Sequence, residues 1–105
     1  MNERDKRKEY NGVVKPILSY LNSLPNTKAI NIHGGIYSER GTPDIIGCID
    51  GRMVVFECKK SEHENLTKIQ EWRLCEWLKA GAVVGGVSDL SHVIMILSIM
   101  GLNEG

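Results

Sequence analysis

The dipeptide Asp50-Gly51, set between two segments rich in branched aliphatic residues, constrains the fold more than any other part of the sequence. Asp-Gly is favoured in two-residue type I′ turns, because both central residues of that turn need a positive φ angle. The flanking segments, residues 44–49 and 52–59, have the length and apolar character of β-strands. We therefore predict an antiparallel hairpin in the middle of the chain.

A two-residue turn also fixes the register of this hairpin, since each residue before the turn then faces the one equally far after it. The register sets Asp44 directly opposite Glu57 on one face of the sheet, with β-carbons about 5 Å apart. Lys59 lies two residues further on and shares that face. A three-residue turn would instead move Glu57 to the other face.

Two carboxylates that face one another repel, and on a buried sheet face they destabilise the fold unless something compensates their charge. A divalent cation is one compensation, since hard cations prefer oxygen ligands. The alternative is that Lys59 and a nearby arginine neutralise the acids, or that solvent reaches the strand ends. The hairpin geometry leaves both explanations open.

The other segments complete an α-β-β-β-α-β-α order. We predict helices at residues 3–22, 67–80 and 89–101, further strands at 28–32 and 82–87, and a glycine-containing loop at 33–43. Gly12 and Pro16 should kink the first helix or delay its start. Thr67 and Ser88 are the expected N-caps of the later helices, and Gly81 the stop of the middle one.

The last strand follows a crossover helix, so it should pair in parallel with its neighbour. The predicted fold class is therefore α/β, with a mixed four-stranded sheet flanked by helices and one further helix at the C-terminus. The 105 residues are enough for one core, so we expect a single domain over residues 1–105.

Charge and cysteine content narrow the functional classes. Lysine and arginine number 13, as do aspartate and glutamate, so no global basic field attracts nucleic acid, although residues 1–40 carry a net charge of +3. The three cysteines lack the spacing of a zinc site or a disulfide framework, and we expect buried, reduced thiols. No signal-peptide core follows the charged N-terminus, and the longest apolar run is too short for a bilayer, so a cytoplasmic location without membrane contact is expected.

The residues around the two acids resemble a known nuclease family. Gly41-Thr42-Pro43-Asp44, followed by Glu57-Cys58-Lys59, resembles the PD-(D/E)XK signature of restriction-endonuclease-like enzymes. The longer pattern Gly-x-Pro-Asp-Ile-Ile-Gly, then Phe-Glu-Cys-Lys-Lys and a helix carrying Gln70, resembles the VRR-NUC branch, particularly its short stand-alone phage and bacterial members. The likeness covers roughly residues 3–95 and implies a restriction-endonuclease-like αβββαβ core.

What this resemblance implies is phosphodiester hydrolysis by a metal-dependent endodeoxyribonuclease. On that basis Asp44 and Glu57 hold Mg²⁺ or Mn²⁺, helped by the backbone carbonyl of Cys58. The metal polarises the scissile phosphate and lowers the pKa of a bound water. Lys59 stabilises the developing charge or orients the attacking water.

Two further residues have both a structural and a catalytic interpretation. Glu9 shares the apolar stripe of the first helix with Val13, and in the resembling family an early-helix glutamate completes the metal shell. Glu3 is its rival, and a solvated surface position is the alternative. Gln70 would form a capping box with Thr67, but the family places a glutamine near the attacking water or the lysine, so Gln70 is also expected at the site.

Several residues are expected to contact the DNA backbone, with a solvated surface role as the alternative. They are Lys60, Lys68, Arg40 and Ser38. Trp72 and Trp77 are five residues apart and cannot both face the same way. For these two side chains we expect packing in the core or at an interface rather than base stacking.

The resemblance also bears on partners. The stand-alone members resemble Holliday-junction resolvases in their dimeric use of the fold, so we expect a homodimer that cleaves branched DNA in a structure-specific way. The segment 90–100 fits this expectation, because it carries more apolar side chains than one packed helix face can bury. The surplus is expected among Ile94, Met95, Ile99 and Met100.

A non-catalytic module that binds nucleic acid or protein on the same fold is the alternative function. The presence together of Asp44, Glu57, Lys59 and Gln70 argues against it.

Overall fold

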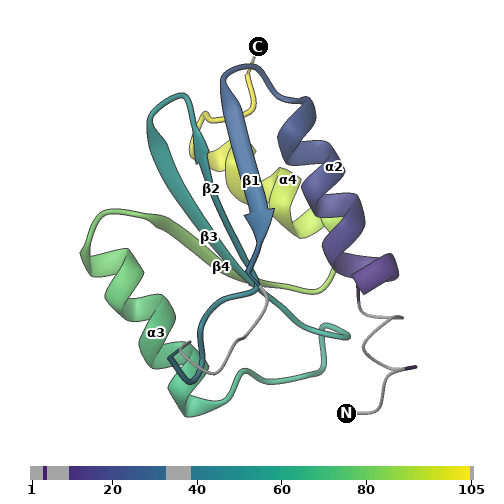
Figure 1. Cartoon of the computed structure of the whole chain (residues 1–105), viewed down its shortest axis with the longest axis vertical. Coiled ribbons are helices and arrows are strands. Elements are labelled where there is room, and N and C mark those ends of the chain that lie inside the picture. The colour runs from purple at the N-terminus through teal and green to yellow at the C-terminus, as the bar shows by residue number, and fades with distance from the viewer. Residues whose placement is uncertain (1–3, 5–9, 33–38, 105) are drawn as a thin grey trace.

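A mixed four-stranded sheet forms the centre of the computed structural model, which describes residues 4, 10–32 and 39–104 (Figure 1). The strands lie in the order β1-β2-β3-β4. β1–β2 and β2–β3 are antiparallel pairs, whereas β3–β4 is parallel. The elements are a π-helical turn η1 (Tyr10–Val14), α2 (Lys15–Ser23), β1 (Thr27–Asn31), β2 (Ile45–Ile49), β3 (Arg52–Cys58), α3 (Lys68–Lys79), β4 (Val83–Val87) and α4 (Leu90–Ile99). The predicted fold class and element order are confirmed over the described residues.

The β2–β3 hairpin has the predicted turn and register. Asp50 and Gly51 have φ angles of 47° and 88°, as a type I′ turn requires. The ladder ends with Ile45 opposite Phe56, which excludes a three-residue turn. Pro43 has no N–H to donate, so the ladder cannot continue past this point in the regular pattern.

Helices cover both faces of the sheet (Figure 1). α2 contacts β1 and α4, and α4 contacts β4, on one face; α3 contacts β3 and β4 on the other. The larger apolar cluster lies under α2 and α4 and includes Ile17, Leu21, Val54, Phe56 and Leu97. A smaller cluster lies under α3 and includes Val55, Leu74 and the half-buried Trp77. The part of the core under α3 is therefore the smaller of the two.

The first helical segment is interrupted, as Gly12 and Pro16 suggested. η1 ends two residues before Pro16, and α2 begins with Pro16 in its first turn. A proline can occupy the first turn because its missing N–H has no partner there in any case. Val13, Val14, Ile17 and Leu21 are buried, so the predicted apolar stripe is correct over the described part of this segment.

Capping residues set the limits of the two later helices. Thr67 caps α3 as predicted, and Gly81 follows its end with a φ of 107°. The predicted Ser88 cap of α4 is wrong: the helix starts one residue later, and the Asp89 carboxylate accepts the N–H of His92. Hydrogen bonds from Ser91 and His92 lower the pKa of Asp89. None of the helices within the described residues has the length and apolar character needed to cross a membrane.

The prediction of three buried thiols is correct only for Cys58. Cys75 is exposed because it lies on the outward side of α3. Cys48 is exposed because α3 packs against β3 and β4, and the smaller cluster under α3 includes Ile46 of β2 but not Cys48. Ile30 of β1, which pairs with Ile46, lies on the same sheet face but outside this cluster, and it is exposed as well.

Candidate active site

The two predicted acids lie together at the end of the hairpin opposite its turn. Asp44 directly precedes β2, and its Oδ2 accepts a hydrogen bond of 2.8 Å from the backbone N–H of Cys58. In a continued antiparallel ladder that N–H would donate to the carbonyl of Pro43, so the Asp44 side chain takes the place of a backbone acceptor. This bond fixes the Asp44 carboxylate against the end of β3.

Glu57 lies beside it on β3 and is only 4% exposed. It follows Val55 by two residues, and its side chain therefore projects from the face that α3 covers. A buried carboxylate is expensive unless hydrogen bonds or charges compensate it. One such bond comes from Gln70, whose Nε2 donates to Glu57 Oε1 over 3.0 Å.

Gln70 serves the helix and the site with the same side chain. Its Oε1 accepts the N–H of Thr67 at 2.8 Å, and its own N–H donates to Thr67 Oγ1 at 3.2 Å, which completes the predicted capping box. The amide nitrogen is left to donate to Glu57. The two interpretations of Gln70 are therefore compatible, and the structure places it at the acid pair.

Lys59 extends this site along β3. Its N–H donates to the carbonyl of Val87 over 2.7 Å, so the pairing with β4 continues one residue past the end of β3. Strand alternation then directs the Lys59 side chain to the same face as Glu57. Lys59 is partly exposed, which lets its ammonium group reach a ligand from solvent.

The donor set around Asp44 and Glu57 suits a hard divalent cation. Both side chains offer carboxylate oxygens, and the backbone carbonyl of Cys58 is adjacent in sequence to Glu57. The Cys58 thiol belongs to the larger core on the opposite face, so sulfur is not part of this set. Over the described ranges no group of three or more His, Cys, Asp or Glu side chains could hold a metal ion. Glu9, the predicted third carboxylate, and its rival Glu3 lie outside the described residues.

Arg73 is a residue that sequence reasoning missed. Its Nε donates to the carbonyl of Arg40 at 3.0 Å, and its guanidinium pairs with Glu76 at 2.8 Å and Glu39 at 3.5 Å. The hydrogen bond with Glu76 and the charge of Glu39 raise the pKa of Arg73. Arg73 thereby joins α3 to the loop that leads into Asp44. Its position three residues after Gln70 was the available signal, because both then lie near the inward side of one helix.

Gly41 brings the same loop against α3. Its φ of 77° favours glycine, and a Cβ at this position would lie 2.9 Å from the carbonyl oxygen of Ile69. The first glycine of the sequence motif is thus a close-packing residue between the loop and the first turn of α3.

Three of the four predicted DNA-contact residues lie in exposed segments next to this end of the molecule. Lys68 and Lys60 are exposed, and the N–H of Lys60 donates to Glu64 Oε2. Arg40 is exposed as well, while Ser38 lies outside the described residues. Trp77 packs in the smaller core as expected, but Trp72 is 62% exposed, so a core role for Trp72 is wrong.

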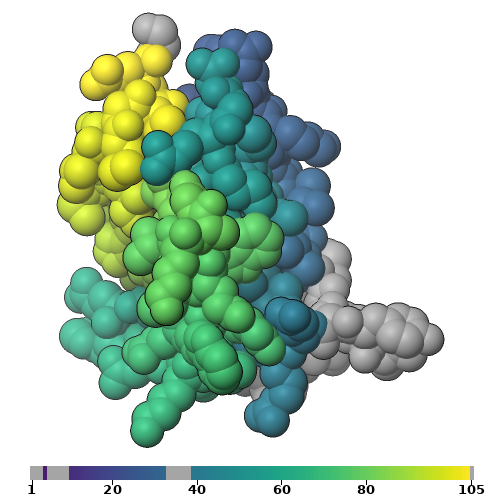
Figure 2. All heavy atoms as spheres, turned by 90° about the vertical axis from the view of Figure 1, so that its left-hand side faces the viewer, coloured from purple at the N-terminus to yellow at the C-terminus, as the bar shows by residue number. Residues whose placement is uncertain are grey.

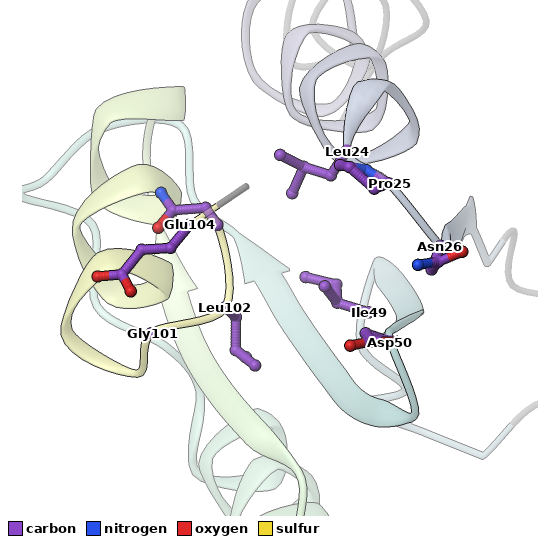
Figure 3. A pocket seen from close by; sticks show the side chains of 9 residues that line it. Leu24, Pro25, Asn26, Ile49, Asp50, Gly101, Leu102 and Glu104 are labelled. Atoms are coloured by element: carbon purple, nitrogen blue, oxygen red, sulfur yellow. The ribbon is translucent and has the colours of Figure 1, made fainter.

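A cavity of about 300 Å³ lies at the other end of the hairpin (Figure 3). The turn at Asp50, the segment after α2 and the segment after α4 form its walls, with Ile49 and Leu102 between them. It is separated from Asp44 and Glu57 by the length of β2 and β3. The acid pair and this cavity are therefore distinct features.

Comparison with known proteins gives no relative: no family model, no curated protein and no solved structure matches this chain.

Proposed function

We propose that this protein is a metal-dependent endodeoxyribonuclease that hydrolyses phosphodiester bonds on a restriction-endonuclease-like core. The observation that carries the proposal is the joint position of Asp44 and Glu57 at the ends of neighbouring strands. Each accepts a hydrogen bond that orients it, from the N–H of Cys58 and from Gln70 respectively. Two oriented acids beside Lys59 give the oxygen donors and the cation that phosphodiester hydrolysis requires.

Each residue has a definable task in that reaction. Asp44 and Glu57, with the carbonyl of Cys58, would hold Mg²⁺ or Mn²⁺. Such an ion, when bound, polarises the scissile phosphate and makes a water molecule more acidic. Gln70 keeps the Glu57 carboxylate in one orientation, which is how residues behind the ligands tune a metal site. The Lys59 ammonium would neutralise charge that develops on the phosphate.

The test is cleavage of a panel of four-way junctions, flaps and duplexes in Mg²⁺, Mn²⁺ or EDTA. We expect cleavage with either metal and none in EDTA. Asp44→Asn should reduce the rate by about 100-fold or more, because a ligand charge is lost while the amide oxygen can still accept the N–H of Cys58. Asp50→Asn is the matched control, since asparagine tolerates the positive φ of this turn and Asp50 lies far from the site.

Full cleavage by Asp44→Asn would overturn the assignment. Binding of junctions by the wild type with no cleavage in any metal would favour the non-catalytic module instead.

The proposed substrate is branched DNA, cut by a homodimer of Holliday-junction-resolvase type. The support comes from α4 and its C-cap residue Met100: the surplus apolar side chains were expected among Ile94, Met95, Ile99 and Met100, and all four are exposed. Exposed contiguous apolar surface usually marks an interface. A two-fold dimer would offer two acid pairs to two strands of a junction.

A further inference from the structure

The outward side of α3 carries a line of exposed residues that the proposed chemistry does not use. Lys68, Trp72, Cys75 and Lys79 are all exposed. At 100° per residue their side chains leave the helix within a sector of about 60°, so they form one stripe along it. Figure 2 views the molecule from this side, where the atoms of α3, coloured green, project from the surface.

Trp72, in the middle of this stripe, is a large exposed aromatic side chain with a cation over its ring. The side chain is 62% exposed, and the guanidinium carbon of Arg73 lies over its ring, 5.9 Å from the centroid. Arg73 is itself held by Glu76 and the carbonyl of Arg40. A cation over the ring attracts the electrons of the indole, and the 62% exposure of Trp72 leaves ring surface accessible to a ligand.

The stripe starts at the end of α3 nearest the candidate active site, but on the outward side of the helix, whereas Gln70 contacts Glu57 on the inward side. Lys68 opens α3 two residues before Gln70, whose side chain contacts Glu57. From Lys68 to Lys79 the helix rises about 16 Å, which matches about five phosphate-to-phosphate steps at the ~3.4 Å spacing of a stacked strand. A strand that leaves the acid pair around the N-terminal end of α3, and then follows its outward side, would pass Lys68, then Trp72, then Lys79.

We propose that this stripe binds unpaired nucleotides next to the scissile phosphate, with one base stacked on Trp72 and phosphates near Lys68 and Lys79. The inference rests on the proposed function and names the part of the substrate that α3 recognises: a single-stranded or flipped-out nucleotide at a branch. Base stacking on an aromatic side chain between cations is the usual chemistry of single-strand binding and does not depend on sequence.

The two charged residues of the stripe, Lys68 and Lys79, are both cationic, which favours nucleic acid over a protein partner. Glu76 is already paired with Arg73, and Glu71 lies on the flank of the helix rather than in the stripe. The apolar surface that suits a protein is on α4, across the sheet. The exposed Leu78 lies on the side of α3 and outside the stripe, so it provides a control.

The two tryptophans allow the contact to be observed directly. Titration with a single-stranded oligothymidylate or a flap oligonucleotide would be followed by tryptophan fluorescence in EDTA, where no cleavage occurs. In Trp77→Phe the remaining emission comes from Trp72, and we expect it to be quenched. In Trp72→Phe the half-buried Trp77 should show little change. An equal quench in both variants would place the nucleotide elsewhere.

Affinity gives the second readout. Trp72→Ala should weaken binding of the single-stranded oligonucleotide about tenfold and duplex binding less, since stacking of one base is worth about 1–3 kcal/mol. Lys79→Ala should reduce the slope of log Kd against log salt concentration by the amount expected for the loss of about one phosphate contact. Leu78→Ala should bind as wild type does.

The outcomes separate this inference from the proposed function. Unchanged affinity in Trp72→Ala, with cleavage intact, would overturn the stripe and keep the nuclease. Quenching of Trp72 in a protein that cleaves nothing would keep the stripe and remove the nuclease. Binding of a protein but of no oligonucleotide at Trp72 would overturn the inference in favour of a protein interface.

Discussion

At the scale of single residues, the side chain of Gln70 has two roles, one in the helix cap and one at the acid pair. One amide oxygen completes the N-terminal cap of α3 and one amide nitrogen holds Glu57. Because the oxygen is engaged by the N–H of Thr67, the amide cannot turn over without losing both bonds. The helix cap therefore orients the Gln70 amide nitrogen that donates to the Glu57 carboxylate.

We predict that Gln70→Ala lowers Mn²⁺ affinity about 10- to 100-fold, since the residue behind the Glu57 ligand is lost. Thr67→Ala is the matched control: it removes the cap hydroxyl and about 1 kcal/mol of stability but keeps the donor to Glu57. Titration calorimetry with Mn²⁺ measures the affinity of each variant. Equal affinity losses in the two variants would mean that helix stability alone governs the site.

The two acids also predict a thermal response. At a metal concentration of 100 times Kd, binding to the folded state adds about 2.7 kcal/mol, which corresponds to a rise in Tm of about 10 °C for a domain of this size. Asp44→Asn should lose most of that rise, and Asp50→Asn should keep it. A similar rise in wild type and Asp44→Asn, by differential scanning calorimetry, would show that the ion binds elsewhere.

Much of the site was predictable at this scale, because strand alternation and the turn fix where side chains point. Asp44, Glu57 and Gln70 lie together as the register and helix phase require. Arg73 was not predictable, since its partners Arg40 and Glu39 are more than 30 residues away in sequence. The exposure of Trp72 depends on how α3 lies on the sheet, which periodicity alone does not give.

At the scale of elements, the position of α3 is set by its contacts with the loop before β2. Gly41 contacts the Ile69 carbonyl, and Arg73 binds the Arg40 carbonyl. Leu74 is the one buried apolar residue of this helix, so these loop contacts contribute more than they would for a deeply buried helix.

Gly41→Ala should therefore destabilise the protein by about 2 kcal/mol or more, because alanine is strained at this φ and its Cβ would meet the Ile69 oxygen. Gly12→Ala, where a Cβ would meet nothing within 4 Å, should leave stability unchanged or slightly higher. Urea denaturation checks both. Cleavage by Gly41→Ala should also fall, since α3 carries Gln70; wild-type stability in this variant would contradict the loop contact.

The sequence was most informative about elements with local signals. Asp50-Gly51 and the Thr67–Gln70 box act within a few residues, and both are present as predicted. The start of α4 is not given by local signals, since Ser88 and Asp89 are adjacent cap residues and the choice between them depends on packing against β4. The π-helical turn before Pro16 is likewise a feature that no short sequence pattern encodes.

At the scale of the whole molecule, the sheet separates two surfaces of different chemistry. The α3 side carries Lys68, Trp72 and Lys79, and the α4 side carries Ile94, Met95, Ile99 and Met100. Because α3 and α4 cover opposite faces, a contact through α4 would leave the acid pair and α3 accessible. Dimer formation and nucleic-acid binding need not compete.

We predict a dimer in solution at micromolar concentration, observed by light scattering. Ile99→Glu should yield a monomer, since this 76% exposed side chain is the most exposed of the α4 surface. Leu78→Glu, an equivalent change at a 55% exposed leucine on α3, should leave the dimer intact. A wild-type monomer that cleaves four-way junctions would refute the dimer and paired incision together.

The hydrogen bond between Asp44 and the N–H of Cys58 has a consequence for the order of folding. It closes the open end of a hairpin whose other end is the tight Asp50-Gly51 turn, so both acids belong to one stretch of fewer than twenty residues. Hairpins form in about 1–10 μs, long before crossover pairing such as β3–β4. We therefore expect the two acids to meet at the outset of folding, and Gln70 and Lys59 to join them only when α3 and β4 dock.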